Sequence, residues 1–428
     1  MTRPLDAPTV AYVCADPGIP VFGTKGASVH IQELVRAWRA RGAHVEVYAV
    51  RRGDEVPADL ADLPVHVVPV ARVPRDGAER EQVAARERAQ QQAAADIARM
   101  VVELRPDVVH ERYSLFSTVL GSVREGMAAQ GASVVTILEV NAPLIDEQRT
   151  HRVLVDEDAA HGALAEQLAA ADVVACVSGP VADWVHGRLD GVRAARHQGV
   201  PAVVVTPNGV NTDRIRATTP DESDVPVVVF VGTLKPWHGV EDLLRAAALA
   251  QRAWRLRIVG DGPQRRAVEE LAATCGRPVE IVGAVPPEQV PATLEGALVA
   301  VAPYPESGDH YFSPLKVYEY AAAALPVVAS RIGQIPEVVE HGRTGLLVPP
   351  SDPAALAAAI DALAADPALA QEMGRAGRSL MVERHSWHAV LDATLAPLTA
   401  IDPKAAGPSA YPGPGAYPVP TGGARGVA

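Results

Sequence analysis

A loop that turns into a helix is predicted at Gly308-Asp-His-Tyr-Phe-Ser-Pro-Leu-Lys-Val-Tyr-Glu-Tyr-Ala-Ala-Ala-Ala-Leu-Pro326. Ser313 suits the N-cap and Pro314 the first helical position, because proline lacks an N–H group and its fixed φ fits there. Free N–H groups in the first turn and the helix dipole favour an anion at this end. Lys316 adds a point charge suited to a phosphate, and Glu319 follows on the same side. The pattern indicates a site for a diphosphate and a sugar diol, as in a nucleotide sugar. A plain buried helix with a solvated lysine and glutamate is the alternative.

The composition is that of a globular protein, with 428 residues of which 48% are hydrophobic and 21% charged. This length allows two or three domains. The net charge of −12 argues against a nucleic-acid or anionic-membrane binder. The sequence shows neither a long apolar run nor a signal segment, and its three cysteines have no metal-ligand spacing. We therefore expect a cytoplasmic protein with reduced thiols, no transmembrane segment and no peripheral membrane contact.

Short apolar runs alternate with helical patterns along the chain, which predicts a parallel sheet in each half. The predicted strands are 10–15, 45–50, 65–70, 108–110, 134–140, 173–177, 203–205, 227–231, 256–259, 279–282, 298–301, 327–329 and 346–348. A polar stretch at 218–224 separates the two halves. Besides the helix in the opening stretch, the main predicted helical segments are 80–104, 354–380 and 387–395. We expect the last of these helices to end at 395 because a proline follows two residues later. From residue 403 a Pro-, Gly- and Ala-rich tail predicts disorder.

Two further loops place glycines and lysines where a strand becomes a helix. They cover residues 23–30 and 232–239, and glycine there lets the backbone approach a phosphate closely. Neither loop fits the dinucleotide or Walker fingerprint, so an oxidoreductase of the Rossmann type and a P-loop NTPase lose their main support. Three of the four lysines in the chain, Lys25, Lys235 and Lys316, fall in these loops and the opening stretch. A plain glycine turn is the alternative.

Polar residues follow several predicted strands, where the ligand crevice of an open parallel sheet lies. His110, Glu111 and Arg112 are crevice candidates by this position alone, and Asn141 follows another strand. A lone histidine at such a place is either catalytic or structural, and the sequence leaves both open for His110.

Six short motifs in the chain together resemble the family 4 glycosyltransferases, which are retaining, nucleotide-sugar-dependent enzymes of GT-B fold. The motifs lie at 26–30, 207–213, 231–239, 260–263, 312–320 and 325–330, in the order of the family. The resemblance implies an α/β protein of two Rossmann-like, doubly wound parallel-sheet domains that face across a cleft. Residues 1–207 would bind the acceptor and 208–384 the donor, 385–402 would cross back as a helix, and 403–428 would form the tail.

The resemblance also assigns site residues. Glu319 would hold the ribose hydroxyls of the donor, Gly26 would meet its diphosphate from the other domain, and Val285 would contact the base. The remaining expected donor-binding residues are Gly232, Thr233, His238, Gly262, Phe312, Ser313, Pro314 and Leu315. The expected catalytic residues are Lys235, Lys316, Glu319 and, from its position at a strand end, His110. Their place in the first half of the chain, and not the resemblance, suggests the expected acceptor-binding residues, which are Asp16, Glu111, Arg112, Glu139 and Asn141.

Three positions, in two loops, depart from the pattern of the family. Tyr311 replaces a glutamate that usually contacts the donor sugar, so backbone groups, Asp309 or Glu306 would take over this role, or it is absent. Thr233 and His238 replace the diphosphate-binding arginine and lysine, with Lys235 as the stand-in. His238 would be cationic only near or below neutral pH.

The expected reaction moves a sugar from a nucleoside diphosphate sugar to a hydroxyl of a small-molecule or glycan acceptor, with retention. No carboxylate nucleophile is evident, which favours a front-face displacement, and we expect no cofactor and no metal. A nucleotide-sugar epimerase and a non-catalytic nucleotide-sugar-binding subunit are the alternatives. We expect a monomer or homodimer, with a hinge at 208–211 for domain closure.

Overall fold

The computed structural model describes residues 7–73, 78–193, 200–221, 223, 225–306 and 310–401. The predicted disordered tail lies outside the described residues, as do Gly308 and Asp309 of the opening stretch.

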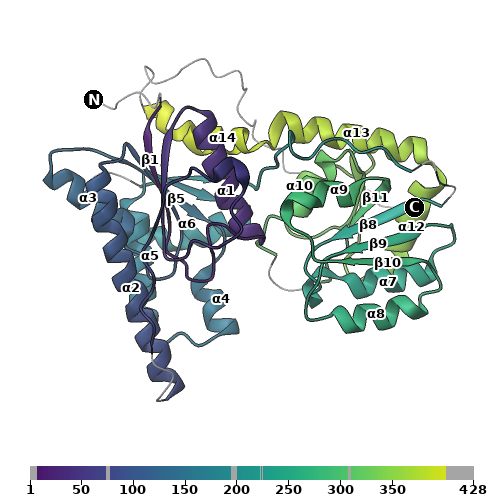
Figure 1. The fold of residues 1–428 in the computed structure, drawn as a ribbon, viewed down its shortest axis with the longest axis horizontal. Helices are drawn as coiled ribbons and strands as arrows, with labels where there is room; N and C mark the ends of the chain where they lie inside the picture. The colour runs from purple at the N-terminus through teal and green to yellow at the C-terminus, as the bar shows by residue number, and fades with distance from the viewer. Residues whose placement is uncertain are drawn as a thin grey trace, which may run out of the picture.

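Two parallel sheets, one in each half of the chain, form the framework of the protein (Figure 1). Over the described residues the first sheet has seven strands in the order β3-β2-β1-β4-β5-β6-β7, and the second has six in the order β10-β9-β8-β11-β12-β13. In both sheets the chain winds outward from a central strand, crosses back, and winds outward on the other side. This is the doubly wound order of Rossmann-like domains, and the predicted α/β fold class is confirmed.

The strands lie within one or two residues of most predicted runs. They are β1 (Thr9–Cys14), β2 (His44–Ala49), β3 (Val65–Val67), β4 (Val108–Arg112), β5 (Val135–Val140), β6 (Val173–Cys176), β7 (Ala202–Val205), β8 (Val227–Val231), β9 (Arg255–Val259), β10 (Val279–Gly283), β11 (Ala297–Ala302), β12 (Val327–Ser330) and β13 (Gly345–Val348). β3 is shorter than the predicted 65–70, and β4 runs two residues further than 108–110.

Helices cover both faces of each sheet. They are α1 (Gly26–Ala40), α2 (Glu79–Leu104), α3 (Val119–Ala129), α4 (Leu144–His151), α5 (Glu157–Ala170), α6 (Gly179–Arg193), α7 (Val240–Leu249), α8 (Arg265–Thr274), α9 (Val290–Leu294), α10 (Leu315–Ala322), α11 (Ile335–Val338), α12 (Pro353–Ala365), α13 (Pro367–Arg384) and α14 (Trp387–Ile401). Short 3₁₀ helices are η1 (Ala58–Leu60), η2 (Pro236–His238) and η3 (Pro287–Gln289).

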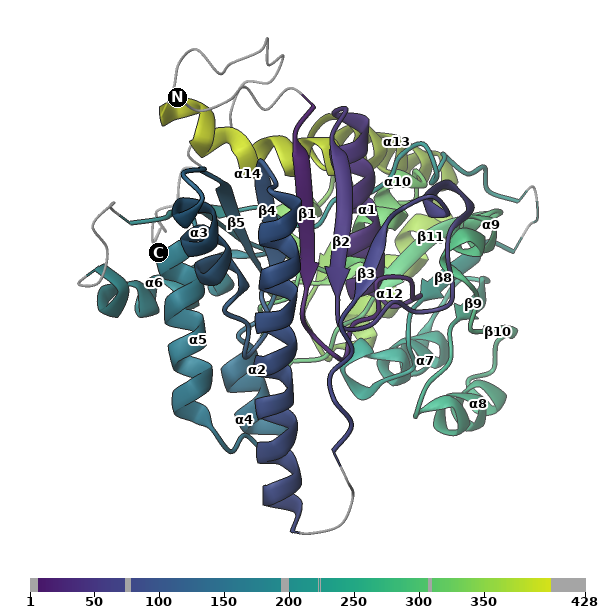
Figure 2. The same cartoon turned by 60° about the vertical axis from the view of Figure 1, so that its left-hand side comes forward.

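The strands are apolar on both sides because both faces of each sheet are buried. In the first domain, α2, α3, α5 and α6 pack on one face, while α1 and α14 pack on the other. Figure 2 shows α2 extending well beyond the sheet that it covers. In the second domain, α7, α8 and α12 cover one face, and α9, α10 and α11 cover the other.

The last helix, α14, returns to the first domain, where Trp387 and Leu391 join the hydrophobic cluster of α1 (Figure 1). The prediction that this helix ends at 395 is wrong, because it continues to Ile401 with Pro397 inside it. A proline removes one N–H donor and so weakens a helix, but packing against the first domain outweighs that loss here.

The predicted helical region at 354–380 is two helices. Asp366 separates them, and its carboxylate accepts a hydrogen bond from the N–H of Leu369 (3.0 Å), which caps α13 directly before Pro367. Among the described residues no single helix is long and apolar enough to span a membrane, and α12 and α13 meet those criteria only as a pair bent by 103°.

Candidate active site

Helix α10 begins one residue later than predicted, at Leu315. Pro314 occupies the N-cap with an extended backbone (φ −80°, ψ 100°), and no side chain caps the helix. The prediction that Ser313 is the cap is wrong: its hydroxyl accepts the N–H of Asn208 (3.1 Å) and lies 3.1 Å from the hydroxyl of Tyr318. The helix therefore presents an uncapped N-terminus, which favours an anion.

Lys316 places a buried ammonium group in the first turn of α10. Among the described residues its Nζ has no hydrogen-bond partner, and it lies over the rings of Phe230 (4.4 Å) and Tyr304 (5.4 Å). Burial lowers the pKa of Lys316 to about 7. A Cβ on Gly232 would lie 2.5 Å from this Nζ, so the glycine leaves room for it. Such a desolvated cation gains strongly from a phosphate.

Glu319 lies one turn deeper on the same helix, and its carboxylate accepts no hydrogen bond from the described residues. Burial raises the pKa of Glu319 to about 7, against the lowering effect of Arg214. The charge of Glu33 raises this pKa further, while that of Lys316 lowers it. The carboxylate of Glu319 and the ammonium of Lys316 thus both lack a hydrogen-bond partner among the described residues. Such a pair suits a ligand that carries both hydroxyls and phosphates.

The second loop lies beside Lys316. The ammonium of Lys235 lies 4.5 Å from the ring centre of Trp237, and the indole of Trp237 is 51% exposed. His238 donates from Nδ1 to the carbonyl oxygen of Thr233 (2.5 Å). Burial, and then the charge of Lys316, lowers the pKa of His238 to about 4. His238 is therefore neutral at pH 7 and becomes cationic only well below neutral pH.

The turn at 260–263 packs its backbone onto this loop. A Cβ on Gly262 would lie 2.6 Å from the carbonyl oxygen of Leu234, so only glycine allows the approach. Arg265, just after the turn, pairs with Glu269 on the surface (2.5 Å). Val285 is partly buried against the apolar cluster that contains α10. The loop and the turn together form one wall beside Lys316.

The opposite wall comes from the first domain. Helix α1 begins at Gly26 after Lys25, and no side chain caps it and no acidic residue lies in its first turn. A Cβ on Gly26 would lie 3.1 Å from Cδ1 of Leu315. Two uncapped helix N-termini, one from each domain, therefore meet next to an unpaired lysine, and Figure 1 shows α1 on the side of its domain that faces α10. Helix N-termini arranged in this way bind anions.

On the side where we expected the acceptor, Glu139 is the centre of a buried network. It accepts hydrogen bonds from Arg112 (2.7 Å), Tyr12 (3.2 Å) and Asn141, and its carboxylate lies 3.0 Å from Nε2 of His30. Burial alone would raise the pKa of Glu139, but the surrounding histidines and Arg112 hold it well below its usual range. The structure thus brings Arg112, Glu139 and Asn141 together, and the charges of Arg112 and Glu139 compensate each other.

The side chains of His110 and Glu111 form hydrogen bonds within the first domain. Nδ1 of His110 accepts a hydrogen bond from the indole of Trp38 (3.1 Å), and the residue is 1% exposed. Glu111 points toward the start of α3, where it accepts hydrogen bonds from Ser117 and from the N–H of Leu120 (3.2 Å). Nε2 of His110 has no hydrogen-bond partner among the described residues and lies 3.5 Å from the carboxylate of Glu139. The catalytic role of His110 and the acceptor contact of Glu111 stay predictions.

The carboxylate of Asp16 accepts the N–H of Gly18 (2.6 Å). Against the lowering effect of burial, its charge, like that of Glu139, raises the pKa of Arg112 in this network. A small cavity of about 10 Å³ adjoins Glu139, His110 and Asn141. This volume holds about one water molecule and is too small for a sugar ring.

Family models match both halves of the chain. The model described as Glycosyltransferase Family 4 matches residues 24–214, and the model described as Glycosyl transferases group 1 matches residues 225–366. The chain belongs to the family 4, group 1 glycosyltransferases.

Curated relatives of this glycosyltransferase chain include two enzymes of Mycolicibacterium smegmatis. A GDP-mannose-dependent alpha-(1-6)-phosphatidylinositol monomannoside mannosyltransferase is 34% identical over 199 residues, which are 42% of this chain and 52% of the relative. An alpha-maltose-1-phosphate synthase is 32% identical over 253 residues, 53% of this chain and 62% of the relative. The chain thus spans about half to two-thirds of the length of these relatives.

Among solved structures, a sucrose-phosphate synthase of Thermosynechococcus elongatus has a similar fold. The two align with a TM-score of 0.62 and 22% identity over 93% of this chain and 99% of the other. The GT-B arrangement of two Rossmann-like domains predicted from the sequence is therefore confirmed.

What takes the role of the family glutamate at Tyr311 stays a prediction, and the structure shows what the neighbouring groups contact. The hydroxyl of Tyr311 donates to Glu147 in α4, and its carbonyl oxygen accepts from Ser178 (2.5 Å), so Tyr311 contacts the first domain. The N–H of Glu306 donates to Ser351 (2.9 Å), and Asp309 lies outside the described residues. Phe312 packs against the ring of Tyr304 (5.1 Å).

Three further residues contact or influence the candidate site and were not among the expected site residues: Asn208, Arg214 and Glu33. Asn208 bonds to the start of α10, and Arg214 and Glu33 surround Glu319 with charge. Asn208 belongs to the family motif at 207–213 and Arg214 follows it directly, which is the one available signal. Their partners lie more than 70 residues away, so periodicity could not reveal them.

Proposed function

We propose that the chain transfers a sugar from a nucleoside diphosphate sugar to a hydroxyl of a small molecule or glycan, with retention at the anomeric carbon. The observation that supports this most directly is the meeting of the uncapped N-termini of α1 and α10 beside the unpartnered ammonium of Lys316. A diphosphate fits such a site because it offers several anionic oxygens to converging N–H donors and one cation.

In this proposal, groups of both domains bind the donor. Its diphosphate lies between α1 and α10, and the carboxylate of Glu319 accepts hydrogen bonds from the ribose hydroxyls. Val285, on the same side of the second domain, lies next to the base. The GDP-mannose dependence in the name of one relative agrees with a nucleotide-sugar donor in this family.

In the proposed step, the bond from the anomeric carbon to the diphosphate oxygen breaks as a bond to the acceptor oxygen forms on the same face. The acceptor proton passes to the departing diphosphate, so no enzyme base is needed. Lys316, Lys235 and the helix N–H groups stabilise the charge that grows on the diphosphate, and this preorganised field lowers the barrier. We propose that these groups act without a metal ion.

A panel of nucleoside diphosphate sugars, assayed by thermal shift and then by mass spectrometry of products from candidate acceptors, tests this function. We expect one donor to stabilise the protein and a glycosylated product whose anomeric configuration, read by NMR, matches that of the donor. Glu319→Ala is expected to weaken donor binding about 10- to 100-fold, because hydrogen bonds to the carboxylate are lost. Glu270→Ala is the control, since Glu270 is exposed and paired with Arg266 on α8.

Other outcomes would contradict the proposal. Isomerisation of the donor without transfer would indicate an epimerase, and donor binding without turnover would indicate a binding subunit. Loss of activity in a metal chelator, restored by a divalent cation, would contradict metal independence. An unchanged donor affinity in Glu319→Ala would place the nucleoside elsewhere.

A further inference from the structure

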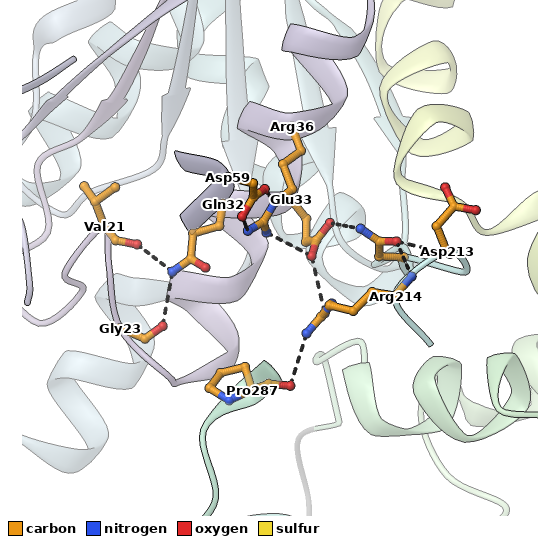
Figure 3. Close-up of polar contacts among 10 residues, drawn as sticks. Val21, Gly23, Gln32, Glu33, Arg36, Asp59, Asp213, Arg214 and Pro287 are labelled. Atoms are coloured by element: carbon orange, nitrogen blue, oxygen red, sulfur yellow. Dashed lines mark hydrogen bonds and ion pairs between the residues drawn. The ribbon is translucent and has the colours of Figure 1, made fainter. Parts of the chain in front are cut away.

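Glu33 joins the two domains from within α1, two turns after Gly26. It is 1% exposed, and its carboxylate accepts hydrogen bonds from Arg36 (3.1 Å) on the same helix and from Asn211 (3.1 Å). The guanidinium of Arg214 lies 3.3 Å from the same carboxylate (Figure 3). A carboxylate this deeply buried is stable only with such partners.

Arg214 continues the connection into the second domain. It donates from NH1 to the carbonyl oxygen of Pro287 (3.2 Å), two residues after Val285, as Figure 3 shows. Its Nε is buried and has no hydrogen-bond partner among the described residues. Arg214 is also the charged residue with the largest influence on Glu319, ahead of Glu33 and Lys316. One guanidinium therefore connects α1 to the loop beside Val285, and its charge lowers the pKa of Glu319, which burial raises.

We propose that Arg214, held in place by Glu33, is a positioning residue of the donor site that ties the nucleoside side of the site to the start of α1 and favours the charged form of Glu319. This inference rests on the proposed function, in which Glu319 binds the donor ribose.

The rigidity of α1 makes this connection effective. Seven residues of helix separate Gly26 from Glu33, which is roughly 10 Å at the usual rise. Gln32, next to Glu33, donates to the carbonyl oxygens of Val21 (3.0 Å) and Gly23 (3.2 Å) and so holds the loop before α1 (Figure 3). The helix end at the diphosphate and the ion pair at the nucleoside therefore move as one body.

A merely structural role for the ion pair makes a different prediction. If Glu33 and Arg214 only held the domains together, removing either partner would have the same effect on the site. In the proposed role the two residues act on Glu319 with opposite sign, because Arg214 favours its charged form and Glu33 disfavours it.

The test is the pH dependence of donor affinity, measured by calorimetry with UDP-glucose and GDP-mannose from about pH 5.5 to about pH 8.5. These donors carry no phosphate that titrates in this range. Affinity rises with pH on the acidic side as Glu319 ionises and falls on the alkaline side as Lys316 loses its proton, so the midpoint of the acidic limb reports the pKa of Glu319. We expect Arg214→Gln to move that midpoint up and Glu33→Gln to move it down, each on the order of one pH unit. The double variant should return close to wild type.

Two further variants serve as controls. Arg214→Lys keeps the positive charge and is expected to keep the wild-type midpoint. Arg39 lies on α1 like Glu33, and its exposed guanidinium pairs with Asp62 (2.9 Å). Arg39→Gln breaks this pair and should change neither the midpoint nor the affinity. Circular dichroism of each variant verifies its fold, and Arg214→Lys with Glu33→Gln still tests the proposal if Arg214→Gln does not fold.

Shifts of the same sign in the two single variants, or a loss of affinity at every pH with an unchanged midpoint, would overturn the positioning role. If the wild-type protein bound neither these donors nor any other nucleotide sugar, the proposed function itself would fail. The two failures are therefore distinguishable.

Discussion

At the scale of single residues, Lys316 and Glu319 are two ionisable groups that burial leaves close to half-charged at neutral pH. Burial lowers the pKa of Lys316 and raises that of Glu319, each to about 7. A protein without ligand pays a desolvation cost for both charges, and a donor with phosphates and hydroxyls offsets it. The ionisation of the pair should therefore change when the donor binds.

Proton exchange on donor binding is expected to change sign near pH 7. At about pH 8 the free protein has a mostly neutral Lys316, which gains a proton beside the diphosphate, so binding takes up protons. At about pH 6 Glu319 is mostly protonated and must ionise to accept from the ribose, so binding releases protons. Calorimetry in two buffers of different ionisation enthalpy measures both. Exchange of one sign across this range would contradict the assigned ionisation states.

At the scale of elements, the approach of α1 to α10 is controlled by one residue without a side chain. Gly26→Val is expected to weaken donor binding about tenfold or more, because its Cβ would already lie 3.1 Å from Leu315 and the added methyl groups crowd the N–H donors. Gly179→Val is a matched control, since Gly179 is also the first residue of a helix and has open space around it. Equal donor affinity in both variants would show that the diphosphate binds elsewhere.

The final helix is held to the first domain by an aromatic anchor. Trp387 is 5% exposed and packs beside Gly209 and the ring of His30 (4.8 Å). We expect Trp387→Ala to lower the free energy of unfolding by about 3 kcal/mol, measured by urea denaturation. Trp237→Ala, at the exposed tryptophan, should leave it nearly unchanged. If Trp387→Ala lowered the free energy of unfolding as little as Trp237→Ala, the anchor of α14 would contribute little to stability.

At the scale of the whole molecule, Asn208 connects the domains through its side chain. The amide donates to the carbonyl oxygen of Ser313 (2.6 Å) and accepts from Nδ1 of His30 (2.7 Å). Asn208→Ala leaves two buried polar groups without these partners, at a cost of about 2 kcal/mol. We expect small-angle scattering without donor to show a larger radius of gyration for Asn208→Ala than for the wild-type protein. Gln92→Ala, which removes an exposed amide within α2, should leave the radius unchanged.

The sequence predicted the framework well because the framework depends on local patterns. Valine-rich runs such as 227–231 must be buried on both sides, and that burial is what makes them central strands. The ends of elements were harder: Pro397 lies within α14 because tertiary packing outweighs a local helix breaker. Ser313 likewise has the composition of a cap, but its hydroxyl is used by Asn208, 105 residues away.

The candidate site was predictable where it depends on backbone and unpredictable where it depends on partners. Gly26, Lys316 and Glu319 lie in motifs whose chemistry is local. Strand position suggested His110 and Glu111 but could not reveal their partners, which are Trp38 and Glu139 for His110 and the start of α3 for Glu111. The link from Glu33 to Arg214 needs two distant segments in contact, so it became visible only in three dimensions.

The exposed indole of Trp237 gives this protein a built-in optical probe. Of the five tryptophans, Trp38, Trp254 and Trp387 are buried, whereas Trp237 lies in the loop beside Lys316 under the cation of Lys235. When a diphosphate draws Lys235 away from the ring, the emission of Trp237 should change and its quenching by acrylamide should fall. Trp237→Phe should abolish that signal while donor binding persists, so donor occupancy can be followed by fluorescence without any label.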